Sequence, residues 1–164
     1  MLTNSKTKLT NLIFLSATFD KNFKMKKILF LTLFSIALFS CSKDKFNNNN
    51  PYLPNYAFSM DVNKSLPTYN ALSFTGNAVR VYPAGGPSRG VIIFNTGSGY
   101  NAYDGACPNQ DLSTCSTLTI SGSNANCPCG SENYNLFTGQ SAGKQYPLKP
   151  YRVEINGEVI RVYN

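Results

Sequence analysis

Histidine is absent from all 164 residues of the sequence. Its absence removes the side chain that most often serves as a general base near neutral pH and as a neutral nitrogen ligand for metals. No pair of carboxylates stands in a catalytic motif, and no serine lies in a pattern that would activate it. The sequence therefore offers little from which to build a hydrolytic site, and we expect a protein that is not an enzyme.

Acidic side chains are also few, 8 against 15 basic ones, but the positive charge is unevenly placed. Residues 1–40 contain six lysines and one aspartate, which gives them a net charge of +5. Residues 41–164 contain the other nine basic and seven acidic side chains, so their net charge is only +2. Because no basic stripe remains in this larger part, no nucleic-acid partner is expected.

The one long apolar run lies near the N-terminus, where residues 25–41 read MKKILFLTLFSIALFSC. The run from Ile28 to Phe39 is shorter than a comfortable membrane span. It follows Lys26 and Lys27, an arrangement typical of the leader of an exported protein.

The end of this run resembles a bacterial lipoprotein signal, because a small residue, Ser40, directly precedes Cys41. The resemblance implies a signal peptide over residues 1–40, with Met25 as the true start, and a lipid on Cys41. The protein is then expected in the bacterial cell envelope, anchored to a membrane and either periplasmic or surface-exposed. A plain secretory leader with an incidental cysteine is the alternative.

A polar segment, KDKFNNNNPYLP at residues 43–54, separates the leader from the remainder. Its asparagines and its bounding prolines are typical of a linker. We expect a lipid-anchored linker over residues 41–54 and one domain over residues 55–164, a length that suits a single core.

The domain is expected to be all-β. Short runs rich in Val, Ile, Thr, Tyr and Phe alternate with Gly, Pro, Asn and Ser, and no amphipathic helix pattern interrupts them. Such spacing favours a small antiparallel barrel or sandwich. The predicted strands are 57–62, 78–82, 90–95, 100–104, 117–121, 134–137, 151–155 and 159–163.

The last two of these strands form a predicted β-hairpin, YRVEINGEVIRVY. Its Asn156-Gly157 pair is typical of a two-residue type I′ turn. The expected solvent-facing residues are Arg152, Glu154, Glu158 and Arg161, and the expected core residues are Val153, Ile155, Val159 and Val162.

Four cysteines lie in the predicted domain: Cys107, Cys115, Cys127 and Cys129. In an exported protein an even number indicates disulfide bonds, and four cysteines allow three pairings. A bond between Cys127 and Cys129 around Pro128 would be strained. Two pairings remain open, Cys107–Cys127 with Cys115–Cys129, or Cys107–Cys129 with Cys115–Cys127.

The segments around these cysteines resemble the Rieske family. YNAYDGACPN at residues 100–109 is followed by CPCGSENYNLFTGQ at residues 127–140 and by the terminal hairpin. This is the order of the two cysteine boxes and the closing strands in that family. The likeness covers residues 78–164 and implies a small antiparallel Rieske-like β barrel or sandwich with a cysteine tip made of two loops.

The sequence departs from the family at the ligands of the [2Fe–2S] cluster, which is held by two cysteines and two histidines. Cys107 and Cys127 match the cysteine ligands. Asn109 stands at the first histidine position, and the second histidine is missing because Cys129 runs directly into Gly130. An amide nitrogen has no lone pair for iron, so we expect no cluster. The alternative is a [2Fe–2S] electron-transfer protein with non-standard ligation, again using Cys107 and Cys127.

In the Rieske family a disulfide joins the second cysteines of the two boxes, which here are Cys115 and Cys129. Cys107 and Cys127 would then face each other. The resemblance therefore implies the bonds Cys107–Cys127 and Cys115–Cys129, with disulfides in place of the cluster. We expect a structural or interaction module of the envelope, with an unidentified envelope protein as a partner.

Three other chemistries could use the same cysteines. A four-cysteine iron–sulfur cluster would normally be exported behind a twin-arginine leader, whereas this leader has a lysine pair. The Cys-x-Cys spacing is unusual for structural zinc. A thiol redox enzyme would need Cys-x-x-Cys at the start of a helix. We therefore expect no metal and no cofactor.

Overall fold

A computed structural model describes residues 46–164, and this part of the chain is all-β, as predicted. The expected leader and Cys41 lie outside the described residues. One 3₁₀ helix, η1 (Pro67–Ser73), lies among the strands, and no described helix has the length and apolar character needed to cross a membrane. The strands are β1 (Ser59–Asn63), β2 (Ala78–Val81), β3 (Val91–Asn95), β4 (Tyr100–Asp104), β5 (Thr119–Ser121), β6 (Asn124–Asn126), β7 (Asn133–Asn135), β8 (Pro150–Asn156) and β9 (Val159–Tyr163).

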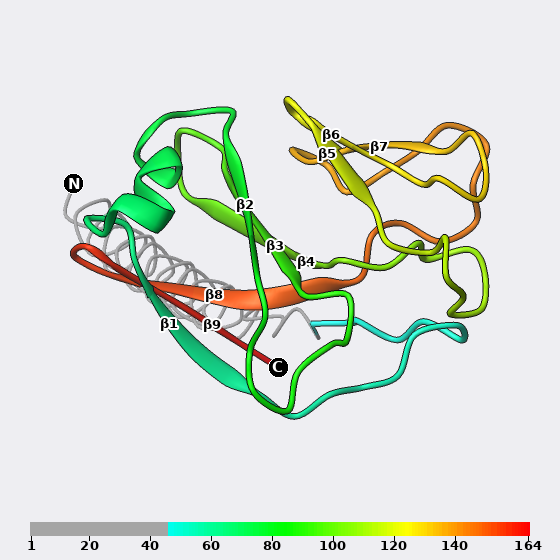
Figure 1. Cartoon of the computed structure of the whole chain (residues 1–164), viewed down its shortest axis with the longest axis horizontal. Helices are drawn as coiled ribbons and strands as arrows, with labels where there is room; N and C mark the ends of the chain where they lie inside the picture. The colour runs from blue at the N-terminus through cyan, green and yellow to red at the C-terminus, as the bar shows by residue number, and fades with distance from the viewer. Residues whose placement is uncertain (1–45) are drawn as a thin grey trace, which may run out of the picture. The chain divides into compact units, whose positions relative to one another are not determined.

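The strands form two antiparallel sheets (Figure 1). The larger sheet has the order β1-β9-β8-β4-β3-β2, and the smaller has the order β5-β6-β7. The smaller sheet lies at the upper right in Figure 1, on the side where the cysteine-bearing loops are found. The predicted antiparallel architecture with a two-loop cysteine tip is therefore confirmed.

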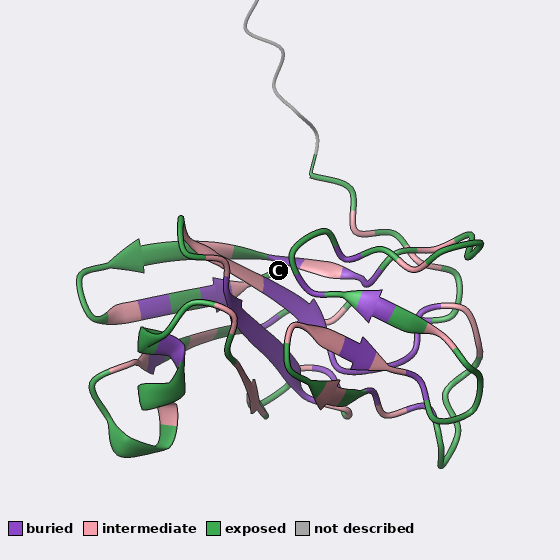
Figure 2. Cartoon of the chain, turned by 90° about the horizontal axis from the view of Figure 1, so that it is seen from above, coloured by how far each residue is buried: buried purple, intermediate pink, exposed green. Residues whose placement is uncertain are grey.

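Strand β3 is the centre of the hydrophobic core, because all five of its residues are buried (Figure 2). Alternate side chains of a strand point to opposite faces of a sheet. Ile92 and Phe94 join one apolar cluster, which also contains Cys107 and Cys127. Val91 and Ile93 join a second cluster, formed with β1, β8, β9 and η1. Cys107 and Cys127 therefore lie with the cluster on one face of β3, and the second cluster lies on its other face.

The terminal hairpin forms over β8 and β9, but its two-residue turn is Gly157-Glu158 and not the predicted Asn156-Gly157, because Asn156 pairs with Val159. Among the described residues only glycines have a positive φ, so the turn is not of type I′, which needs a positive φ at both central residues. Two of the four expected core residues are also placed differently. Val153 pairs with Val162, and Ile155 pairs with Ile160, so these four share one face. Val159 pairs with Asn156 and lies on the other face, because the two-residue turn reverses the alternation. Ile155 is on the apolar face yet 50% exposed, since it stands next to the turn beyond the end of the core.

Strand β6 was not among the predicted strands. Its sequence, Asn-Ala-Asn, has a single apolar residue, and strand prediction needs a longer alternating run. Ala125 is fully buried against the cluster that contains the cysteines, and β6 pairs with both β5 and β7. The strand is therefore fixed by its neighbours in space rather than by its own sequence.

The described part of the expected linker lies against the domain. Asn50 donates from Nδ2 to the carbonyl of Pro108 at 2.9 Å, and its Oδ1 accepts from the backbone N–H of Leu53. Lys149, itself buried, donates from Nζ to the carbonyls of Leu53 and Pro54. These hydrogen bonds fix residues 50–54 beside the cysteine loops, a contact that a polar linker composition does not signal.

Removing the apolar anchor of this segment should destabilise the domain. Leu53 is 3% exposed, so Leu53→Ala should lower the free energy of unfolding by about 2 kcal/mol or more. The matched control Leu66→Ala, at a residue that is 50% exposed, should change it by less than about 0.5 kcal/mol. Urea unfolding of the two variants measures the difference, and equal effects would contradict the packing of residues 50–54 on the domain.

Candidate functional site

The candidate site is the tip formed by residues 105–117 and 127–132, where the cysteines gather. The first loop leaves β4 and is closed at its base, because Leu118 donates its N–H to Gly105 and Cys107 donates to Ser116, at 2.9 and 2.8 Å. Glycine is required at position 105, since a Cβ there would collide with the carbonyl of Arg89. These backbone hydrogen bonds hold the base of the loop at the end of β4 independently of the disulfide bonds.

Arg80, which reaches the tip from β2, was not identified by sequence reasoning. Its guanidinium donates to the backbone carbonyls of Arg89 and Leu118, so one side chain ties two loops together. Burial lowers the pKa of Arg80 from its ordinary value. An isolated arginine in a strand gives no local signal of such a role.

Two disulfide bonds join the loops, Cys107–Cys127 and Cys115–Cys129, which are the pairs that the family resemblance implied. The Cα atoms are 5.7 Å apart in the first bond and 5.3 Å apart in the second. Closing loops with sequence separations of 20 and 14 residues contributes about 3 kcal/mol per bond in the chain-entropy treatment. The first bond is buried in the core, whereas Cys115 and Cys129 are both exposed.

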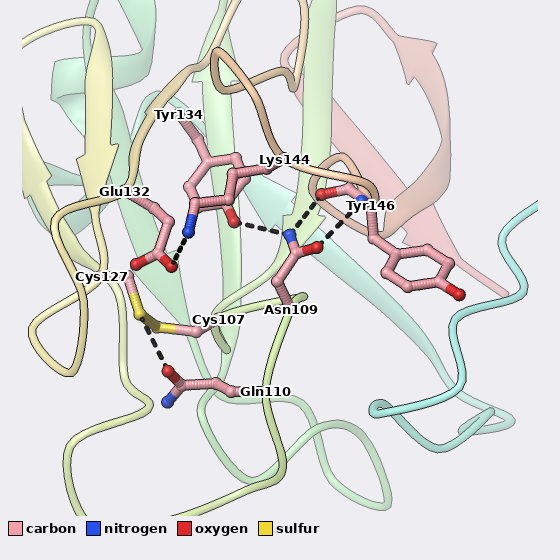
Figure 3. A network of polar contacts seen from close by, with 8 residues as sticks. All are labelled: Cys107, Asn109, Gln110, Cys127, Glu132, Tyr134, Lys144 and Tyr146. Carbon is pink, nitrogen blue, oxygen red and sulfur yellow. Dashed lines mark hydrogen bonds and ion pairs between the residues drawn. A yellow bond between two sulfur atoms is a disulfide. The ribbon is translucent and has the colours of Figure 1, made fainter.

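Asn109, which the family resemblance aligned with a histidine, cross-links the tip to neighbouring parts of the domain (Figure 3). Its Nδ2 donates to Tyr134 Oη at 2.8 Å and to the carbonyl of Tyr146 at 2.7 Å. Its Oδ1 accepts from the N–H of Tyr146 at 3.0 Å. Both ends of the amide are thus engaged, and the side chain joins the cysteine loop to β7 and to the segment before β8.

Glu132 and Lys144 form an ion pair beside the buried disulfide, with Lys144 Nζ 2.6 Å from Glu132 Oε1 (Figure 3). The hydrogen bond from Lys144 lowers the pKa of Glu132, and the same bond raises the pKa of Lys144. The other oxygen of Glu132 lies against Gly130, where an added Cβ would collide with it. Because that carboxylate ends a flexible side chain, it can move aside, and the contact does not by itself exclude a larger residue at position 130.

Two further side chains lie around the buried disulfide. The Gln110 side chain contacts Cys127, with Oε1 3.7 Å from Sγ. Tyr134 is fully buried, and that burial raises the pKa of its hydroxyl. Sequence reasoning missed the roles of Tyr134, Lys144 and Tyr146, because their partners are 12 to 37 residues away along the chain.

The residues present do not fit a [2Fe–2S] cluster of the Rieske type. The cysteines that match its thiolate ligands are bonded to each other, and a disulfide sulfur is not a thiolate. The Asn109 amide is hydrogen-bonded at both ends and has no nitrogen lone pair to offer. Within residues 46–164, no three His, Cys, Asp or Glu side chains are grouped as metal ligands would be.

The sequence matches no protein-family model and no curated protein. Solved structures similar to this chain include a ferredoxin from Sphingomonas yanoikuyae B1, with 19% identity and a TM-score of 0.42, covering 57% of this chain and 93% of that chain. The ferredoxin of carbazole 1,9a-dioxygenase from Nocardioides aromaticivorans IC177 has 16% identity and a TM-score of 0.42, covering 67% and 98%. The terminal oxygenase of carbazole 1,9a-dioxygenase from Novosphingobium sp. KA1 has 14% identity and a TM-score of 0.43, covering 65% and 30%. Likeness at this level does not carry function to this chain.

Replacing Asn109 should loosen the tip. Asn109→Ala removes three hydrogen bonds and leaves the Tyr134 hydroxyl without its donor, so the free energy of unfolding should fall by about 2 kcal/mol. Gln110→Ala, next to it, removes only a contact to sulfur and should cost less than about 1 kcal/mol. Urea unfolding of both oxidised proteins makes the comparison, and a silent Asn109→Ala would refute the cross-linking role.

The Glu132–Lys144 pair should make stability depend on acid pH. Because the folded-state pKa of Glu132 is lowered, its contribution is present above the unfolded-state pKa and is lost as pH falls through the folded-state value. Glu132→Gln should therefore be less stable than the parent near neutral pH, and the gap should close between about pH 5 and about pH 3. Thermal unfolding across this range measures the gap; a gap that stays constant would exclude the ion pair as its cause.

Proposed function

We propose that this chain is an exported envelope lipoprotein whose Rieske-like domain has exchanged its iron–sulfur cluster for disulfide bonds. The domain would act as a structural or interaction module and not as an enzyme. Lipidated Cys41 would hold it at the membrane, and its partner would be another envelope protein. The observation that carries the proposal is the bond between Cys107 and Cys127, the two cysteines at the ligand positions of the family.

The surroundings of this bond support its structural role. Cys107 is 1% exposed and Cys127 is 3% exposed, and both belong to the apolar cluster under β3. A bond in such a place is shielded from solvent reductants. Asn109 links the first loop to β7 and to Tyr146, and the Glu132–Lys144 pair links the second loop to the segment before β8. On this proposal, these bonds and contacts are what hold the tip together.

The export part of the proposal rests on the leader. The lysine pair, the short apolar run and the Ser40-Cys41 junction follow one another in the order of a lipoprotein signal. Export also agrees with the disulfides, since such bonds persist in oxidising compartments and are rare in the cytosol. The leader therefore supports the same location as the cysteines.

The test is to count free thiols in the full-length protein, purified from bacterial membranes without reductant. The chain has five cysteines. With two disulfides and a lipid on Cys41, alkylation should label no thiol before reduction and four after it. The intact mass should rise by four hydrogens on reduction, and the protein should be colourless and free of iron.

Each part of the proposal can fail separately. A fifth labelled thiol after reduction would mean that Cys41 carries no lipid, and would remove the anchor while leaving the domain unchanged. A native mass heavier by two irons and two sulfides, with a red-brown colour, would overturn the loss of the cluster. The electron-transfer alternative would then stand, and its reduction potential would become the quantity to measure.

A further inference from the structure

We propose that Cys115–Cys129 is a thiol–disulfide exchange site, opened and closed by an external dithiol while Cys107–Cys127 stays intact. The co-reactant belongs to the class of protein or small-molecule dithiols. This activity goes beyond the proposed structural role, because a bond that only cross-links has no need to be exchangeable. It rests on the two disulfides alone, and not on the lipid anchor or the envelope partner.

The contrast in exposure between the two bonds is the first support. Cys107 and Cys127 are nearly inaccessible, at 1% and 3% exposure, and pack in the apolar cluster. Cys115 and Cys129 are both exposed on the surface of the tip. Exchange requires a thiolate to approach one sulfur along the line of the S–S bond, so access decides which bond reacts. Only the outer bond offers that approach without unfolding.

Ser113 is placed to assist the sulfur that leaves. Its hydroxyl lies 3.6 Å from Cys115 Sγ and 3.5 Å from Cys129 Sγ, so it can donate a hydrogen bond to either. Arg89 donates from Nη2 to the carbonyl of the same serine at 2.6 Å, which brings a fixed positive charge into this loop. Hydrogen-bond donors and nearby cations favour the thiolate form of cysteine. The Ser113 hydroxyl is thus in position to stabilise the thiolate that forms when the bond opens.

Both flanking segments keep their anchors when the outer bond is open. Ser113 and Ser116 bond to each other through backbone and hydroxyl groups, and Cys107 donates its N–H to Ser116. On the other loop, Gly130 donates its N–H to the carbonyl of Cys127, and Cys127 donates its own to Glu132 at 2.9 Å. None of these contacts uses the Cys115–Cys129 bond. Opening it therefore leaves the inner bond and the loop bases in place.

The exchange balances in two steps. A thiolate of the dithiol attacks one sulfur of the Cys115–Cys129 bond, and the bond electrons pass to the other sulfur, which leaves as a thiolate. The second thiolate of the dithiol then attacks the mixed disulfide and releases the first cysteine. The protein gains two electrons and two protons as two thiols, and the dithiol becomes a disulfide. The reverse steps close the bond.

Reduction of the full-length native protein by dithiothreitol, quenched at intervals with an alkylating agent, tests the proposal. Trypsin does not separate the cysteines, because no Lys or Arg lies between Arg89 and Lys144. Cleavage before Asp104 and Asp111 and after Leu118, with fragmentation between Cys127 and Cys129, assigns each label. Cys115 and Cys129 should be labelled at least about tenfold faster than the inner pair, with an unchanged circular dichroism spectrum, and reoxidation by oxidised dithiothreitol before the quench should re-form the outer bond and prevent the labelling.

Three variants distinguish exchange at the Cys115–Cys129 bond from a general loosening of the tip. Ser113→Ala should slow opening of the outer bond by about three- to tenfold, whereas Thr114→Ala, an exposed neighbour in the same loop, should leave the rate unchanged. The double variant Cys115→Ser with Cys129→Ser should remain folded and show no fast labelling. Equal labelling of all four cysteines, or labelling only on unfolding, would overturn the proposal, and an unchanged rate in Ser113→Ala would overturn the role of its hydroxyl.

Discussion

The buried bond between Cys107 and Cys127 is the constraint on which the tip depends. The two loops that it joins enter from different sheets, one after β4 and the other after β6. Without a covalent link, the entropy of ordering both loops would have to be offset by their few apolar residues. The bond removes part of that cost from the unfolded chain and places two sulfurs in the apolar cluster. Leu118, Tyr134 and Leu136 pack in the same cluster, so the small sheet is attached to the domain through it.

Strand β3 connects the cluster around this bond to the rest of the hydrophobic core. Both faces of the strand are buried, one under the cysteine cluster and the other under the cluster formed with β1, β8, β9 and η1. A strand buried on both faces reads as a continuous apolar run, here Val-Ile-Ile-Phe. Because one strand serves both clusters, loosening of the tip exposes apolar surface that supports the large sheet as well.

The sequence was sufficient for the strands with strong local signals. The strand 100–104 and the pairing of the two terminal strands were predicted because alternation is local, but the turn lies one residue later than predicted, at Gly157-Glu158. Strand β6 was not, since Asn-Ala-Asn gains its strand geometry from the partners on either side. The face of Val159 was also assigned wrongly, because a two-residue turn changes which residues share a face.

Some residues of the candidate site were likewise predictable from the sequence, and others were not. Cysteine spacing and family resemblance pointed to the cysteines and to Asn109, because these residues carry a motif. The contacts of Arg80, Lys144 and Lys149 carry none, since each of these side chains meets groups that are distant in sequence. Long-range polar contacts of this kind follow from the packing of the strands and are not encoded in local pattern.

The hydrogen bonds of Asn109 help to hold the shape of the tip in a chain that has no histidine. A neutral imidazole presents one donor and one acceptor, and the amide of asparagine presents both kinds of group on a shorter side chain. Here the amide directs both groups inward, to Tyr134 and to the backbone of Tyr146. The side chain that the family resemblance aligned with a histidine is therefore engaged with polar groups of this domain. What the tip still offers to another molecule is its outer surface, where the Cys115–Cys129 bond and the Ser113 hydroxyl lie together.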